Sequence, residues 1–110
     1  MAFMPNGAKI NTDSIWTALK EVIDPELGVN IVDLGLVYEV NVHDNGFVEV
    51  EMTLTTPACP LSSYFERVIP ITVSNKVNEV GSVLVTITWN PPWQPQMMSD
   101  EAKRQMGWTT

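Results

Sequence analysis

The chain has 110 residues, of which 45% are hydrophobic and 17% charged, and its formal net charge is −7. This length and composition indicate one folded domain with its own core and exclude a disordered chain. The acidic balance argues against a nucleic-acid partner and favours a metal ion or cationic patches on other proteins. No apolar run is long enough for a membrane span or a secretory leader. The single cysteine cannot form an internal disulfide, so we expect a cytoplasmic protein.

The first helix is predicted to follow a flexible N-terminal lead. Residues 1–11 contain Pro5 and Gly7 and show no period, whereas residues 12–110 are expected to form a single domain. After the cap residues 11–13, apolar side chains recur on one helical face, at Ile15, Trp16, Leu19, Val22 and Ile23. Pro25 is predicted to end this helix, because a proline disfavours the helical conformation of the residue before it.

Three segments alternate between apolar and polar residues, as half-buried strands do. The first two, residues 36–42 and 48–54, flank Asp44-Asn45-Gly46, in which Asn-Gly is a strong hairpin signal. The third runs from Val83 to Trp89. A right-handed helical crossover between the second and third strands would make these two parallel, which predicts a mixed sheet.

A second helix is expected between the second and third strands. Apolar residues repeat at helical spacing from Leu61 to Val77, and Gly81 is predicted to close the element. Pro70 lies inside this run and predicts a kink or a break near Glu66.

The C-terminal part is predicted to be an extended segment followed by a short helix. Residues 90–95 contain three prolines, which favour an extended path. Ser99 is a suitable N-cap for a third helix, and Gly107 a suitable stop. The tryptophans of this region and its flanks could stack on a ligand, although packing is the commoner role: Trp89, Trp93 and Trp108.

The element order is therefore helix, strand, strand, helix, strand, short helix. This order predicts a two-layer α+β fold, with the helices packed on one face of a small three-stranded sheet. The other sheet face would be open to solvent or to a partner.

The only cysteine lies in the segment Thr55-Thr56-Pro57-Ala58-Cys59-Pro60, between the second strand and the second helix. Pro60 suits the first helical position, which places Cys59 near the N-cap. Unpaired N–H groups and the helix dipole favour a thiolate there, and the thiolate is the form that binds metals or attacks electrophiles. A small buried residue filling a tight turn is an equally good interpretation.

Two carboxylates, Asp24 and Glu26, lie in the turn formed by residues 24–28. The local interpretation, which the residues alone favour, is that Asp24 ends the helix and accepts hydrogen bonds from the turn. In the functional interpretation the pair supplies acid–base or ligand groups near Cys59. The lone His43 lies a strand's length from Cys59, so a Cys/His nucleophilic pair is not indicated.

Four segments together carry a family resemblance: residues 24–28 (DPELG), 31–38 (IVDLGLVY), 52–60 (MTLTTPACP) and 89–93 (WNPPW) followed by Met98-Ser99. From about residue 12 onward the chain resembles the SufT/PaaD-like metal–sulfur cluster biosynthesis family. The resemblance implies the iron–sulfur cluster assembly domain fold and a role in maturing or delivering clusters, without an established enzymatic turnover. It also places a site at Cys59, surrounded by Asp24, Glu26, Thr55 and Thr56. Pro70 and the β-branched residues after it depart from the family's usual second helix.

One cysteine cannot hold a cluster in a four-thiolate site. We therefore expect Cys59 to bind an iron–sulfur cluster or iron only transiently, in a site shared within a homodimer or completed by a partner's cysteines. Asp24 and Glu26 could provide oxygen ligands or orient the loop, and Thr55 and Thr56 could bond the backbone around Cys59. The expected partners are iron–sulfur client apoproteins and other assembly factors.

Two other functions stay open on the residues. Cys59 could be an enzymatic nucleophile with Asp24 or Glu26 as its base. Alternatively, the chain could be a non-catalytic interaction module that uses the open sheet face, in which case Cys59 is structural.

Overall fold

The computed structural model describes residues 10–55 and 61–107. In chain order the elements are α1 (Thr12–Leu19), β1 (Val37–Val42), β2 (Phe47–Met52), α2 (Leu61–Lys76), β3 (Ser82–Ile87), the short 3-10 turn η2 (Pro95–Met97) and α3 (Asp100–Gln105). This is the predicted α-β-β-α-β-α order. Within these residues no helix combines the length and the apolar character that a membrane span requires.

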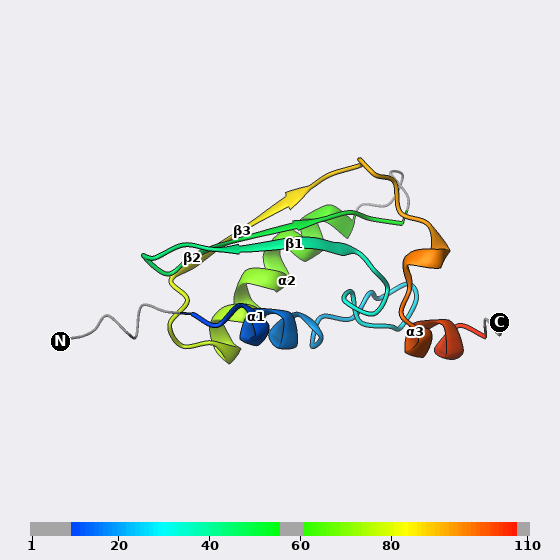
Figure 1. Cartoon of the computed structure of the whole chain (residues 1–110), viewed down its shortest axis with the longest axis horizontal. Helices are drawn as coiled ribbons and strands as arrows, with labels where there is room; N and C mark the ends of the chain where they lie inside the picture. Colours follow the sequence, from blue (N-terminus) through cyan, green and yellow to red (C-terminus); the bar gives the residue numbers. More distant parts are fainter. Residues whose placement is uncertain (1–9, 56–60, 108–110) are drawn as a thin grey trace.

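The strands and the two longer helices form two layers (Figure 1). The sheet has the order β1-β2-β3, with β1 antiparallel to β2 and β2 parallel to β3, so the mixed sheet is confirmed. Helix α2 packs against β3 and α1, and α1 packs against β1. The described helices leave the opposite face of the sheet uncovered, as predicted. The chain after β3 descends past the end of the sheet to α3.

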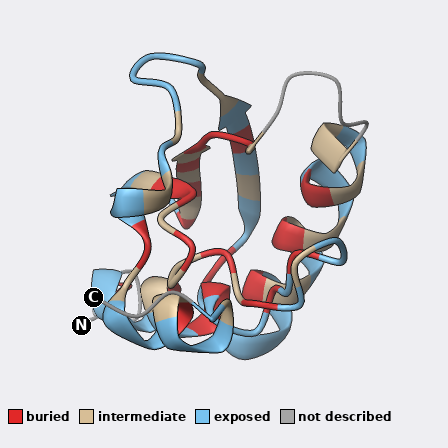
Figure 2. Ribbon diagram, turned by 90° about the vertical axis from the view of Figure 1, so that its right-hand side faces the viewer, coloured by how far each residue is buried: buried red, intermediate tan, exposed pale blue. Residues whose placement is uncertain are grey.

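The core lies between the sheet and these helices (Figure 2). The alternation predicted for β2 is confirmed, because Val48, Val50 and Met52 are completely buried while the residues between them are not. They pack in one cluster with fully buried residues of both helices: Ile15, Leu19, Phe65, Ile69 and Val73. Each such side chain contributes about 1.5–3 kcal/mol by leaving water, which makes this cluster the main source of stability.

Helix α1 ends earlier than the sequence predicted. It stops at Leu19, well before Pro25, and Ile23 is 44% exposed instead of lying on a buried helical face. The reason is a tertiary one. The Ile31 N–H donates to the Val22 carbonyl at 3.0 Å, and Ile23 forms an isolated antiparallel bridge with Asn30. This pairing competes with the helix for the same backbone groups.

Helix α2 is continuous through Pro70, so the predicted break near Glu66 does not occur. A proline within a helix costs about 3 kcal/mol. Phe65 and Val73, which lie on either side of Pro70, are both fully buried, and their burial offsets a cost of that size. The helix ends at Lys76 rather than at Gly81. The Gly81 N–H instead donates to the Gly46 carbonyl at 2.8 Å, which sets the start of β3 beside the hairpin turn.

Candidate functional site

The predicted cysteine loop connects β2 to α2. Thr55 is half-buried and follows the buried residue Leu54, and α2 begins at Leu61. Cys59 and Thr56 lie outside the described residues, as does the predicted helical position of Pro60. The strand-to-helix location of the loop therefore agrees with the sequence analysis, and the environment of the Cys59 sulfur stays a prediction.

The structure gives Asp24 a local structural role. Asp24 is only 2% exposed, and its Oδ1 accepts hydrogen bonds from the N–H groups of Glu26 at 2.8 Å and Leu27 at 3.1 Å. Its carbonyl accepts the Gly28 N–H at 2.8 Å, and Gly28 has a positive φ of 74°. Asp24 thus closes the turn onto itself, which is the local interpretation made from the sequence. Glu26, in contrast, is exposed at the surface of the same turn.

A polar cluster at the end of the sheet was missed by the sequence analysis. The Tyr38 hydroxyl donates to the Pro91 carbonyl at 2.8 Å and lies 3.6 Å from the Met97 Sδ. Burial raises the pKa of Tyr38, and the neighbouring Thr53 hydroxyl acts in the opposite direction. Thr53 is completely buried, and its Oγ1 is the buried side-chain polar atom of the described residues that lacks a hydrogen bond of ordinary geometry.

The C-terminal segment covers this end of the sheet. The Trp93 Nε1–H donates to the Leu34 carbonyl at 2.7 Å, so Trp93 is a packing residue as the sequence favoured. Trp89 is 45% exposed and is not part of the core, and Trp108 lies outside the described residues. Gly35, at a φ of 80°, lies so close to Met97 that a Cβ at this position would be 2.5 Å from the Met97 carbonyl oxygen.

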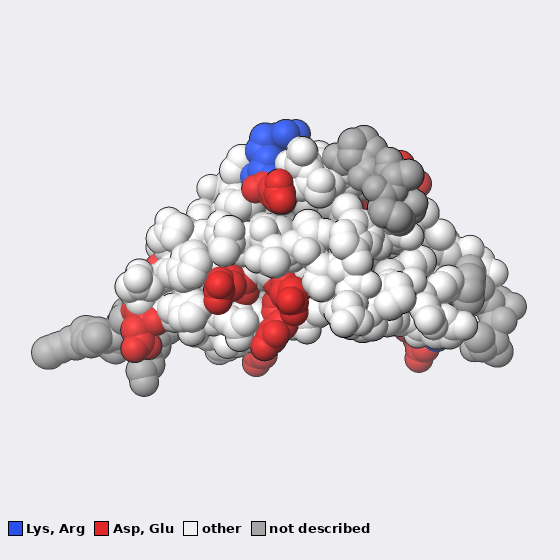
Figure 3. All heavy atoms as spheres, turned by 90° about the horizontal axis from the view of Figure 1, so that it is seen from above, with Lys and Arg blue, Asp and Glu red and all other residues white. Residues whose placement is uncertain are grey.

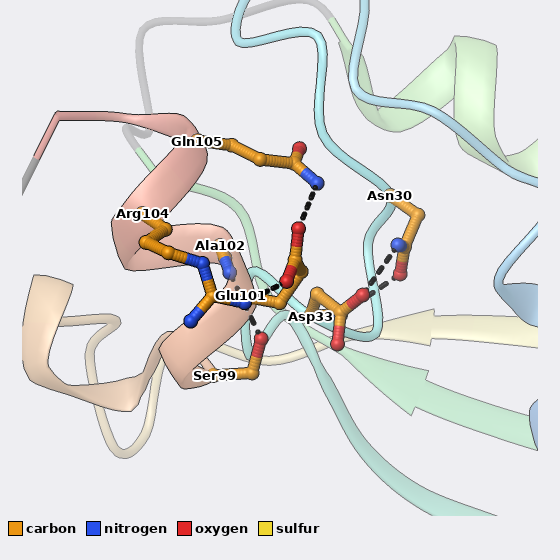
Figure 4. A network of polar contacts seen from close by, with 7 residues as sticks. All are labelled: Asn30, Asp33, Ser99, Glu101, Ala102, Arg104 and Gln105. Atoms are coloured by element: carbon orange, nitrogen blue, oxygen red, sulfur yellow. Dashed lines mark hydrogen bonds and ion pairs between the residues drawn. The ribbon is translucent and has the colours of Figure 1, made fainter.

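Helix α3 is held against the segment that follows the Asp24 turn (Figure 4). The Asp33 Oδ2 accepts from the Asn30 side-chain amide at 2.7 Å, and the Asp33 N–H donates back to the Asn30 Oδ1 at 2.9 Å. The Asp33 carbonyl then accepts the N–H of Ser99 at 2.7 Å. Ser99 caps α3 as predicted, because its Oγ accepts the Ala102 N–H at 3.1 Å. These bonds fix residues 30–33 and the start of α3 relative to one another.

Surface charges on α3 complete this arrangement. Glu101 interacts with the side chains of Gln105 and Arg104, and these contacts, the Gln105 hydrogen bond first, lower the pKa of Glu101. Asp33 acts against this shift because it carries the same charge. The network thus joins residues 30–33, which follow the Asp24 turn, and helix α3 into one frame.

The described residues do not form a metal site by themselves. Nowhere in residues 10–55 and 61–107 are three His, Asp or Glu side chains grouped so that they could hold a metal ion. His43 lies at the hairpin end of the sheet, where its Nε2 is 2.9 Å from the Glu49 Oε1.

A mixed three-stranded sheet, with helices on one face and a C-terminal segment over one end, defines a small two-layer α+β domain. Residues 12–85 match the family model described as iron-sulfur cluster assembly protein, and the chain belongs to this family. The resemblance seen in the four sequence segments is thus confirmed.

Relatives and a solved structure agree with this assignment. The chain is 48% identical over 86 residues to the Fe-S protein maturation auxiliary factor SufT of Staphylococcus aureus (strain USA300), covering 78% of this chain and 97% of the relative. It is 42% identical over 95 residues to the Fe-S protein maturation auxiliary factor YitW of Bacillus subtilis (strain 168), covering 86% and 92%. Its fold is similar to the crystal structure of a domain of unknown function from Bacillus anthracis, with a TM-score of 0.83 and 40% identity over 86% of this chain and 90% of that one.

Proposed function

We propose that this chain is a cytoplasmic maturation factor that helps to deliver iron–sulfur clusters, or iron, to client apoproteins through Cys59. The observation that carries the proposal is its membership of the iron–sulfur cluster assembly family, together with two relatives named as Fe-S protein maturation auxiliary factors. The cluster or iron is cargo in this proposal, and the chain itself is not an enzyme.

The mechanism starts from incomplete ligation. A thiolate is the natural ligand of iron–sulfur cargo, and the chain has a single cysteine. The remaining ligands would come from the Cys59 of a second subunit or from cysteines of the client. Cargo held by so few ligands of one chain can leave it when the client offers more thiolates, which is what delivery requires.

The other predicted residues have supporting roles in this mechanism. Asp24 holds the turn of residues 24–28 through its two backbone hydrogen bonds. Glu26 is exposed on that turn, and in this mechanism its carboxylate would be the acidic group that meets cargo or a partner. Thr55 and Thr56 would bond the backbone of the cysteine loop.

The test is the Cys59→Ser variant. In cells that lack the wild-type protein, this variant should fold normally and fail to restore the activity of iron–sulfur clients. After anaerobic reconstitution with iron and sulfide, the wild type should show cluster absorption and a mass gain that the variant lacks, and native mass spectrometry will show whether two subunits share the cargo. Full client activity with Cys59→Ser would refute the assignment.

A further inference from the structure

The sheet face that carries no helix has a composition of its own. Because β2 buries Val48, Val50 and Met52 toward the helices, the residues between them point to the opposite side, and the strand register identifies their neighbours in β1 and β3. We call this set the open face: Glu39, Asn41, Phe47, Glu49, Glu51, Ser82, Leu84 and Thr86.

The open face is acidic and contains neither lysine nor arginine. Figure 3 looks onto it and shows acidic side chains near its middle with no basic side chain among them. Glu39 and Glu51 are direct cross-strand partners. Like charges in this position destabilise a sheet, and no lysine or arginine of the described residues pairs with either glutamate. Among the described residues, the ion-pair partner of Glu49 is His43, whose Nε2 lies 2.9 Å from the Glu49 Oε1.

The carboxylates surround a hollow with an aliphatic component. A concavity of about 240 Å³ lies on this face, lined by Glu39, Asn41, Glu49, Val50, Glu51 and Thr86. Beside it on β3, Leu84 is 48% exposed and lies opposite Glu49 in the register. Lysine and arginine have an apolar stem and a cationic head, so the stem of one such side chain could pack against the exposed Leu84 while its charge meets the glutamates.

We propose that the open face is a docking surface for a partner protein that presents several lysine and arginine side chains, one of which enters this hollow. None of the open-face residues belongs to the cysteine loop, and the proposal does not depend on the role proposed for Cys59. Charge complementarity selects the partner, because a basic surface would relieve the repulsion between Glu39 and Glu51 on binding. A second copy of the chain does not fit, since two open faces would bring like charges together.

The experiment uses the full-length ¹⁵N-labelled chain and, as the probe, a synthetic peptide of alternating arginine and leucine. Amide signals of Glu39, Asn41, Glu49, Glu51 and Thr86 should shift during the titration, and the affinity should fall as salt is added. A peptide with citrulline in place of arginine keeps the shape and removes the charge, and it should not bind.

Variants distinguish specific binding of the peptide at the open face from nonspecific attraction of a cationic peptide to a chain of net charge −7. Glu39→Gln and Glu51→Gln should each weaken binding about threefold or more while raising the melting temperature, because each removes the cross-strand repulsion. Glu66→Gln makes the same charge change on the exposed surface of α2 and serves as the control. Cys59→Ser should bind the peptide like the wild type, which keeps this test independent of the delivery function.

Several outcomes would overturn the proposal. One is an equal loss of affinity in Glu66→Gln and Glu39→Gln. Another is a set of shifts spread over acidic residues of every element. Absence of binding at low salt, or self-association of the chain through the open face in sedimentation experiments, would also refute it.

Discussion

Gly35 packs so closely against Met97 of the C-terminal segment that a single added carbon atom would overlap the backbone there. Its φ is 80°, and a Cβ would lie 2.5 Å from the carbonyl oxygen and 2.9 Å from the carbonyl carbon of Met97. Two costs therefore add in Gly35→Ala: about 1–2 kcal/mol for an L-residue at positive φ and about 1–3 kcal/mol for overpacking against backbone. We expect a loss of about 2–5 kcal/mol, a large share of the stability of a domain of this size.

Gly28 provides the matched control. It has nearly the same φ, 74°, and no atom lies within 4 Å of where its Cβ would be. Gly28→Ala should therefore cost only the conformational part, about 1–2 kcal/mol. Urea denaturation of the three proteins measures both values. Amide hydrogen exchange at Ser99, whose N–H donates to Asp33, should be faster in Gly35→Ala and unchanged in Gly28→Ala. Equal losses in the two variants, with Ser99 still protected, would refute the reasoning.

Two further predictions concern polar groups of the frame. Burial raises the pKa of Tyr38, so the folded state holds the phenol proton more tightly than the unfolded state does. The stability that this proton adds to the folded state is complete below the ordinary pKa of about 10. It is lost as pH rises through the raised pKa. Urea denaturation between about pH 8 and pH 11 should thus show a steeper alkaline loss in wild type than in Tyr38→Phe, and parallel curves would contradict this. Asp24→Asn keeps an Oδ1 that can accept the N–H groups of Glu26 and Leu27, so it should retain both stability and client maturation, whereas Asp24→Ala should lose about 1–3 kcal/mol. Failure of client maturation in a stable Asp24→Asn protein would show that the charge itself is needed.

The sequence pattern was sufficient to predict features that depend only on residues close together in the chain. The alternation of β2, the hairpin at Gly46 with its φ of 83°, and the Ser99 cap of α3 were all predicted from neighbouring residues. Each depends on contacts within a few positions of the chain. The mixed sheet followed from the helical crossover predicted between the second and third strands rather than from any single residue.

The errors arose where distant segments compete for the same groups. The end of α1 depends on the bond from Ile31 to Val22, which no helical pattern in residues 12–23 reveals. Thr53 is one of the polar positions in the alternation predicted for residues 48–54, yet it is completely buried. Thr53 lies beside Tyr38, whose hydroxyl contacts Pro91 and Met97 from a distant part of the chain, and these contacts are visible only in three dimensions.

The hydrogen bonds of the turn also indicate different roles for Asp24 and Glu26. A carboxylate that is 2% exposed and already accepts two backbone N–H groups has little capacity left for cargo, and withdrawing it would open the turn. Glu26 is presented on that turn, and the turn is followed by residues 30–33, which the Asn30–Asp33 bonds and the Ser99 N–H hold in place. A site built on a rigid frame keeps its ligand side chains in position while loops and partners exchange. We therefore propose that Asp24 maintains the turn and that Glu26 is the residue of the pair that contacts cargo or a partner.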